Sequence, residues 1–235
     1  VCLSSKSKIN DQKSSVEGQQ SDLYRKIRSF KSGVKITLFI VIHVVGITAT
    51  ALTFYWIAKY TGLHWDGPER FSWHPPLMVL GLVYLLGVAL STHRLWPGSE
   101  NSLKIMHLIF MVVVLVCLVV AFAIVVDFVK GHHFSTLHGW LGLIFSVIII
   151  IEVPVFLIVF GFNISKDSRS KLMKWHIKST FVILLLSLAV SLTGFQGHIL
   201  THNYNEITII NLTGLVIFLF ITIVTYVLMV EGSGN

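Results

Sequence analysis

The chain has 235 residues, of which 54% are hydrophobic and only 12% are charged. An ordinary soluble domain carries about 25% charged residues, and the mean hydropathy here is +0.78. For the chain as a whole, this composition excludes a water-soluble globule, a disordered polypeptide and a nucleic-acid-binding module, and it predicts a protein that crosses the membrane several times. The net charge of +7 is therefore interpreted as a signal of membrane topology.

Residues 1–33 are polar and end in a basic run, so we expect a disordered tail that touches an anionic membrane surface. Six apolar stretches follow, each long enough to cross a hydrocarbon core of about 30 Å. These stretches lie near 34–58, 73–93, 103–127, 137–161, 173–197 and 207–230. The predicted fold is an all-α membrane protein, with a six-helix bundle over 34–230 and a short C-terminus at 231–235.

The orientation of the bundle follows from the basic residues between the spans. Fifteen Lys and Arg residues lie in the segments on one side, whereas the other side holds only Lys59, Arg70 and Lys130. Because positively charged loops stay in the cytoplasm, both termini and their tails are predicted to be cytoplasmic.

Four of the eleven histidines lie close to the start of a predicted span, namely His74, His107, His138 and His176 on the second to fifth spans. Consecutive spans run in opposite directions, so the second and fourth spans start on the outer side, and the third and fifth start on the inner side. The four residues therefore form two predicted pairs, His74 with His138 and His107 with His176.

Two imidazoles on facing helices are the axial ligands that a six-coordinate b-type haem needs, and this ligation suits electron transfer. We expect one haem near each face, with the two irons roughly 15–20 Å apart along the membrane normal. Gly81 and Gly142 lie where a porphyrin would need room. A single intramembrane His is more often a hydrogen-bonding residue or part of a proton relay, but four in two face-matched pairs favour haem.

The sequence around these residues resembles the cytochrome b561 family of transmembrane di-haem reductases over about residues 70–197. The motifs that carry the resemblance are Phe71-Ser-Trp-His74-Pro75-Pro-Leu-Met78, Leu103-Lys104-Ile-Met-His107, Leu137-His138-Gly-Trp140-Leu-Gly142 and Leu172-Met-Lys-Trp175-His176. The approach Tyr24-Arg25-Lys-Ile-Arg28 and the Ser-Trp-His-Pro sequence are similar to the branch called cytochrome b561 domain-containing proteins.

The resemblance implies an enzyme in which four central helices hold two b-type haems. Electrons would pass from cytoplasmic ascorbate to monodehydroascorbate or a ferric chelate on the opposite side. By the same resemblance, Lys104 and Arg169 occupy the positions of basic residues that bind ascorbate. Glu100 stands where plant members carry a further basic residue.

The outer substrate site departs from the family pattern. Ser135 stands where plant members carry Tyr, and the preceding loop contains His132 and His133. His64, His198 and His202 are also predicted on the outer side, where they are interpreted as solvated residues or as a surface that attracts metal ions.

Glu152 lies about four helical turns after His138 in the fourth span, which places it roughly 21 Å along the helix and within about 40° of the same face. It is predicted to point into the bundle near the inner haem. There it would be a hydrogen-bonding residue or take part in proton transfer.

Two other classes of function remain open. One is a His-lined metal or proton transporter, and the other is a di-haem electron-carrying subunit that has no ascorbate site of its own. A pure electron carrier needs no basic dock, so Lys104 and Arg169 favour the enzyme. A homodimer is compatible with these features, and the sequence does not distinguish an endomembrane from the plasma membrane.

Overall fold

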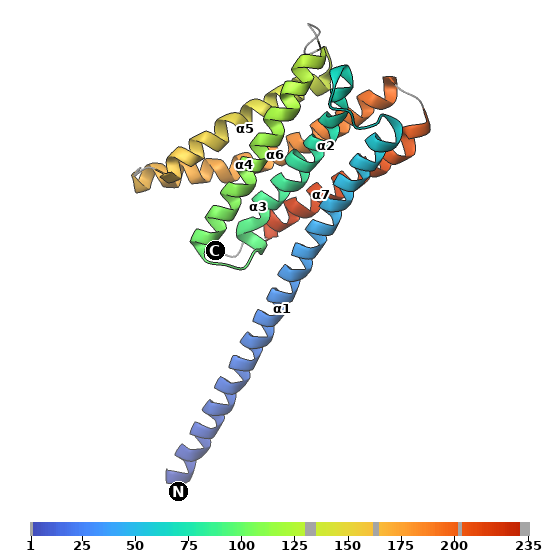
Figure 1. Cartoon of the computed structure of the whole chain (residues 1–235). Helices are drawn as coiled ribbons and strands as arrows, with labels where there is room; N and C mark the ends of the chain where they lie inside the picture. The colour runs from blue at the N-terminus through green and yellow to red at the C-terminus, as the bar shows by residue number, and fades with distance from the viewer. Residues whose placement is uncertain (1, 130–134, 162–164, 202–203, 231–235) are drawn as a thin grey trace. The chain divides into compact units, whose positions relative to one another are not determined.

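A computed structural model describes residues 2–129, 135–161, 165–201 and 204–230, and in these ranges the secondary structure is entirely helical (Figure 1). The elements in chain order are α1 (Cys2–Tyr60), η1 (Gly67–Trp73), α2 (His74–Met78), η2 (Val79–Leu85), α3 (Leu86–Leu95), α4 (Glu100–Val129), α5 (Leu137–Gly161), α6 (Lys166–Thr201), η3 (Tyr204–Glu206) and α7 (Ile207–Val230). Hydrocarbon offers the backbone no hydrogen-bonding partner, so helices that satisfy their own N–H and C=O groups are the expected structure.

Six helices are long and apolar enough to cross a membrane, and they match the six predicted spans in number and position. They are Ser32–Tyr60, Gly67–Leu95, Glu100–Phe128, Leu137–Val159, Asp167–Leu200 and Ile207–Val230. The fifth begins at Asp167, ahead of the predicted start at 173, because the polar and basic residues that precede its apolar run are also helical. The prediction of an all-α six-helix membrane protein is confirmed.

The first helix is longer than the first predicted span. α1 begins at Cys2 and continues as one helix to Tyr60, and the tail predicted over residues 1–33 stays a prediction. The segment contains no proline, and its Ser, Lys and Gln residues do not prevent a helix from extending backwards out of the apolar run. The chain divides into two compact units, 1–41 and 42–235, and the residues discussed below belong to the second.

The second span is composite, since η1, α2, η2 and α3 follow one another within it. Pro75 and Pro76 lie in the first turn of α2, where a missing backbone N–H costs nothing. The middle element, η2, is a π-helix, which frequently marks a functional region. Its Leu82 carbonyl accepts a hydrogen bond of 2.7 Å from the Ser187 hydroxyl of α6. A buried polar contact therefore joins the second and fifth spans.

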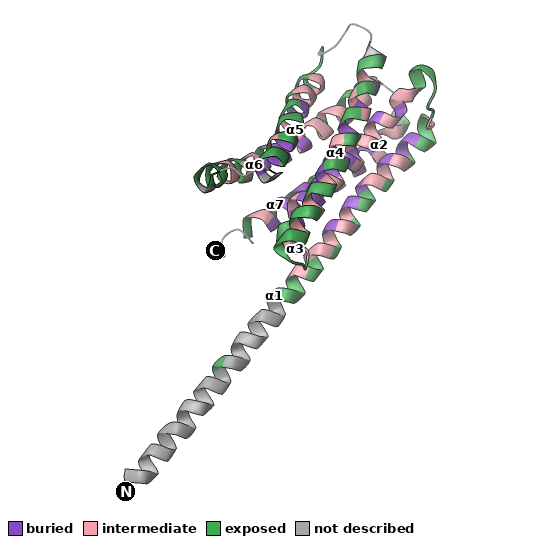
Figure 2. Cartoon of the chain, turned by 60° about the vertical axis from the view of Figure 1, so that its left-hand side comes forward, coloured by how far each residue is buried: buried purple, intermediate pink, exposed green. Residues whose placement is uncertain are grey.

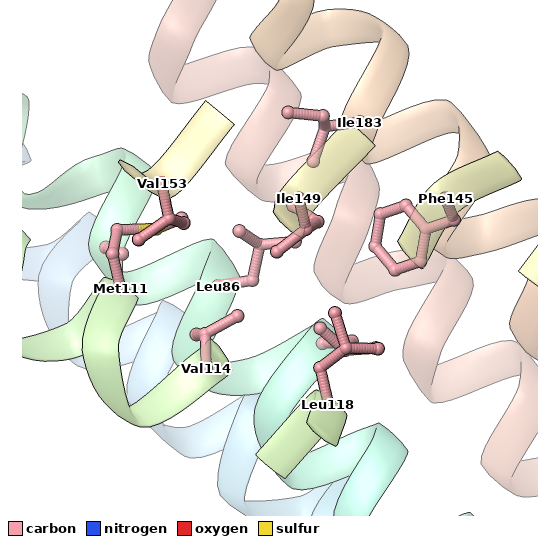
Figure 3. Packing of buried hydrophobic residues seen from close by; sticks show 10 residues of the cluster. Leu86, Met111, Val114, Leu118, Phe145, Ile149, Val153 and Ile183 are labelled. Atoms are coloured by element: carbon pink, nitrogen blue, oxygen red, sulfur yellow. The ribbon is translucent and has the colours of Figure 1, made fainter. Parts of the chain in front are cut away.

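A cluster of buried apolar side chains fills the centre of the bundle (Figure 3). Its members come from all four central spans: Leu82, Leu86, Ala89, Met111, Val114, Leu118, Phe145, Ile149, Val153 and Ile183. On α4 these residues lie between His107 and Ala121, and on α5 they begin after His138. The cluster thus occupies the middle of each span and excludes water from it.

Exposed residues lie along the helices of the bundle (Figure 2). Many of them are large apolar residues, as expected for helices that face lipid. On α4, for example, Val112, Val116 and Val119 are exposed, whereas Val114 and Leu118 are completely buried. At one end of the bundle, Trp56 of α1 donates a 2.6 Å hydrogen bond to Glu206, the last residue of η3, which precedes α7. The first and last spans thus meet outside the central four.

Candidate functional site

Three capped helix starts position the histidines of α4, α5 and α6. The Ser99 hydroxyl accepts the Ser102 N–H at 3.2 Å, and the Thr136 hydroxyl accepts the Gly139 N–H at 3.1 Å. The Ser165 hydroxyl accepts the Ser168 N–H at 3.3 Å. Such caps fix where a helix begins, and thereby the depth of His107, His138 and His176 in their helices. His74 is the first residue of α2.

The structure brings together both predicted pairs. The imidazole rings of His74 and His138 have centres 6.2 Å apart and planes inclined at 87°. The rings of His107 and His176 have the same separation, 6.2 Å, and the same angle, 87°. The two pairs are built from different helices, α2 with α5 and α4 with α6, and yet share one geometry.

This separation suits one metal ion between two imidazoles. A metal–nitrogen bond is about 2 Å long, and the nitrogen lies about 1 Å from its ring centre, so two rings on opposite sides of one ion have centres about 6 Å apart. Elsewhere in the described ranges, no group of three or more His, Cys, Asp and Glu side chains is placed to hold a metal ion.

Hydrogen bonds fix the orientation of three of the four rings. His74 Nδ1 lies 3.3 Å from the Ala121 carbonyl, and His107 Nδ1 lies 2.8 Å from the Ala89 carbonyl. His138 Nδ1 lies 3.0 Å from the Val190 carbonyl. Because a carbonyl only accepts, each Nδ1 carries the proton and each Nε2 has a free lone pair. Metal-binding histidines characteristically have this arrangement.

The two pairs lie at well-separated levels. On α4, Ala121 lies about four helical turns after His107, and on α6, Val190 lies about four turns after His176. Each interval corresponds to about 21 Å along the helix axis. The apolar cluster fills the space between the two levels.

Around His74 and His138, aromatic and small residues complete the site. The Phe71 ring stacks on His74, with ring centres 5.4 Å apart and planes inclined at 10°. Gly194 of α6 faces His138, and a Cβ at this position would lie only 2.8 Å from the imidazole Cε1. Sequence reasoning missed Gly194, although its position about five helical turns after His176, on the same face of the helix, was a usable signal.

The two glycines expected to make room for a porphyrin behave differently. A Cβ on Gly81 would lie 2.5 Å from Cβ of Cys117, so this glycine serves the close contact of η2 with α4. A Cβ on Gly142 would meet no described atom within 4 Å, so open space adjoins it. The role of Gly142 beside a porphyrin stays a prediction.

Around His107 and His176, further side chains contact the pair. The His93 ring centre lies 5.6 Å from that of His107, so a third histidine contacts the pair. The Phe156 ring lies 4.1 Å from that of His176. Glu152 is only 4% exposed, and its Oε2 lies 3.4 Å from His176 Nδ1. The rise and the 100° turn per residue correctly predicted that Glu152 lies at this end of the bundle and points into it.

The two predicted docking cations lie at the end of the bundle that carries His107 and His176. Lys104 precedes His107 by one helical turn and donates a 2.6 Å hydrogen bond to Glu100. Arg169 is exposed near the start of α6, and its charge acts on Glu100 together with that of Lys104. Glu100 therefore contacts Lys104 directly, which the sequence did not reveal.

The other predicted outer histidines have separate surroundings. His198 lies 3.1 Å from the Glu206 carboxylate and edge-on to Trp56, so it is a packing residue. His64 lies 3.8 Å from Glu69. His132, His133 and His202 lie outside the described residues.

Comparison with known proteins identifies the family. The family model of eukaryotic cytochrome b561 matches residues 73–201, more than half of the chain, and this range includes all four paired histidines. The chain belongs to the cytochrome b561 family. One member, the lysosomal membrane ascorbate-dependent ferrireductase of Mus musculus, is 30% identical over 211 residues, which cover 80% of this chain and 86% of the relative.

Two further b561 relatives illustrate the range of the similarity. The transmembrane ascorbate-dependent reductase of Sus scrofa is 29% identical over 197 residues, 78% of each chain. The transmembrane ascorbate ferrireductase 2 of Arabidopsis thaliana is 26% identical over 198 residues, 77% of this chain and 86% of the relative.

The residues present fit the b-type haem that this family implies. Each pair offers two imidazoles at a separation that suits one metal ion, and three of the four have Nε2 free for ligation. Gly142, one helical turn after His138 on α5, meets no described atom within 4 Å of an added Cβ. The assignment of the four histidines as haem ligands stays a prediction.

Proposed function

We propose that this chain is a transmembrane oxidoreductase that carries electrons from cytoplasmic ascorbate to monodehydroascorbate or a ferric chelate on the opposite side. The observation that carries the proposal is the presence of two matching imidazole pairs, each with ring centres 6.2 Å apart. The family match supports it, because the Sus scrofa relative is named an ascorbate-dependent reductase and the Mus musculus relative a ferrireductase.

Two b-type haems are assigned, one to His74 and His138 and the other to His107 and His176. When bound, such a haem supplies one-electron transfer, and two imidazole ligands leave no position for dioxygen. The Ala121, Ala89 and Val190 carbonyls fix the orientation of three of the imidazoles. The apolar cluster keeps water out of the region between the pairs.

Lys104 and Arg169 are proposed to dock ascorbate beside the His107–His176 pair. An anionic enediol is attracted by two cations at the cytoplasmic end of the bundle, and a charged donor strengthens each hydrogen bond to it. Glu100 competes for Lys104 through their 2.6 Å hydrogen bond. Lys104 therefore becomes fully available to ascorbate when the incoming anion displaces the Glu100 carboxylate.

The electrons and protons balance in single steps. One ascorbate anion gives up one electron and one proton and becomes monodehydroascorbate, and the proton is released on the cytoplasmic side. On the opposite side, the electron reduces a ferric chelate to the ferrous state. With monodehydroascorbate as acceptor, one proton is taken up there and ascorbate is formed.

The acceptor is proposed to dock in a pocket beside His74. The pocket has a volume of about 300 Å³ and lies between η1 and α4, with Arg70, Phe71 and Asp127 in its lining. Phe71 also stacks on His74. Arg70 supplies a positive charge for an anionic acceptor, although Asp127 at 3.7 Å partly offsets it.

The topology completes the proposal. Residues 1–33 form a basic cytoplasmic segment, 34–230 form the membrane domain with its core at 70–197, and 231–235 end in the cytoplasm. This orientation places Lys104 and Arg169 on the side where ascorbate is abundant, and it follows from the excess of Lys and Arg in the segments on that side.

Sided vesicles provide the test. Purified protein would be reconstituted with a ferric chelate sealed inside, and ascorbate would be added to the face that carries the N-terminus. The expected result is ferrous iron inside the vesicles only when the protein is present. Haem that ascorbate does not reduce, in protein with both haems bound, would instead favour a subunit that receives electrons from a partner enzyme.

A further inference from the structure

One of the four paired histidines has a different partner from the others. His74, His107 and His138 each place Nδ1 at a backbone carbonyl of a neighbouring helix. His176 instead places Nδ1 3.4 Å from a carboxylate oxygen of Glu152. The pair that contains His176 is thus the only one, among the described residues, in which a carboxylate takes the place of a carbonyl.

The position of Glu152 on its helix matches the positions of the three acceptor carbonyls on theirs. In two cases the accepting carbonyl lies about four helical turns after a histidine of the other pair: Ala121 after His107, and Val190 after His176. Ala89 stands at a slightly longer interval after His74, along a span that contains a π-helix. The matching position on α5, at the same interval after His138, is Glu152. Its side chain therefore occupies the place of the fourth acceptor.

Packing holds the two groups against each other. Glu152 is 4% exposed and the His176 side chain 19% exposed, and the Phe156 ring lies 4.1 Å from the imidazole. Within the described part of the chain, His176 Nδ1 and Glu152 Oε1 have no hydrogen-bond partner. Buried polar groups are rarely left unpaired. A small rotation of the carboxyl group, over the existing 3.4 Å approach, would satisfy Nδ1.

We propose that Glu152 is a positioning residue, which accepts the Nδ1–H of His176 and thereby orients this imidazole and strengthens it as a ligand. The inference rests on the proposed function, because it presupposes haem between His107 and His176. A carboxyl oxygen behind a ligating imidazole makes the ring a stronger donor, which favours the ferric over the ferrous state. Glu152 thus lowers the midpoint potential of this haem relative to that of the other.

Redox titration of purified protein with both haems bound tests the proposal. The variants are Glu152→Ala, which removes the acceptor, and the nearly isosteric Glu152→Gln, which keeps a weaker one. The matched control is Glu206→Gln, which changes a partly buried carboxylate beside a histidine outside the two pairs, 3.1 Å from His198. The component that disappears in His107→Ala identifies the haem in question.

Glu152→Ala is expected to shift the equilibrium of this haem at least tenfold toward the ferrous state, which is about 59 mV for a one-electron couple. Glu152→Gln is expected to shift it in the same direction by less, and the low-spin EPR signal of this haem should change in both variants. The other haem and the Glu206→Gln control should keep their potentials.

If both Glu152 variants bind two haems with unchanged midpoint potentials, the role of Glu152 is overturned, but the proposed function is not. Equal shifts of both haems would also overturn this role, because they would indicate a general structural effect. If Glu152→Ala does not bind haem, the midpoint potential of this haem in Glu152→Gln decides whether Glu152 acts on it. Wild-type protein that lacks two haems would instead contradict the proposed function itself.

Discussion

Gly194 offers a sharp test of the His74–His138 pair. A Cβ placed on Gly194 would lie 2.8 Å from Cε1 and 3.0 Å from Nδ1 of His138. Non-bonded carbon atoms approach to about 3.5–4.0 Å, so Gly194→Ala forces the imidazole to withdraw by about 1 Å. Metal–ligand distances tolerate only about 0.2 Å, and the displacement also breaks the 3.0 Å hydrogen bond to Val190. Affinity at this site should fall by about 10- to 100-fold, as for other changes next to a ligand.

The assay is the ratio of haem to polypeptide, combined with reduced-minus-oxidised spectra. Gly194→Ala should lose haem toward one per chain, and the remaining haem should still be reduced by ascorbate. Gly197→Ala is the matched control on the same helix, because a Cβ there meets no described atom within 4 Å. Two haems with unchanged spectra in Gly194→Ala, or equal losses in both variants, would refute the reasoning.

Three further substitutions separate the two ends of the bundle. His107→Ala should remove one haem and abolish reduction by ascorbate, whereas His138→Ala should preserve part of that reduction and block electron delivery to a sealed ferric chelate. Lys104→Ala should raise the ascorbate concentration for half-reduction, by up to about fivefold, without changing the haem content. Glu100→Gln should lower this concentration, because the exposed carboxylate no longer competes for Lys104. Unchanged values of both variants in a spectroscopic titration would contradict the proposed docking. Arg70→Ala should slow the reduction of an anionic ferric chelate in stopped-flow measurements while ascorbate still reduces the protein at the wild-type rate, and equal slowing of both reactions would contradict the proposed pocket.

The spans and the pairing of the four histidines followed from the sequence for physical reasons. A hydrocarbon slab demands apolar helices of a set length, so hydropathy alone located the six spans. Consecutive spans must run in opposite directions, so a histidine near the start of each central span had a defined side. The fixed turn of about 100° per residue likewise directed Glu152 toward the second pair.

Other parts of the site depend on how the helices rotate and pack, which periodicity does not determine. The contact of Gly194 with His138, and that of His93 with His107, required the relative rotation of two helices. The carbonyls that accept from the histidine Nδ1 atoms could not be predicted either. Every residue has a backbone carbonyl, and only the relative position of two packed helices decides which one faces the imidazole. Glu100 was recognised as a departure from the family, but its hydrogen bond to Lys104 depends on a choice of rotamer.

The central claim is that two histidine pairs, each formed by two alternate membrane spans, ligate one b-type haem per pair. The apolar cluster separates the two haems. The pyridine haemochrome of purified polypeptide measures the haem content most directly. The account predicts two b-type haems per chain, both low-spin and neither covalently attached. A colourless polypeptide, or one with a single haem, would contradict it.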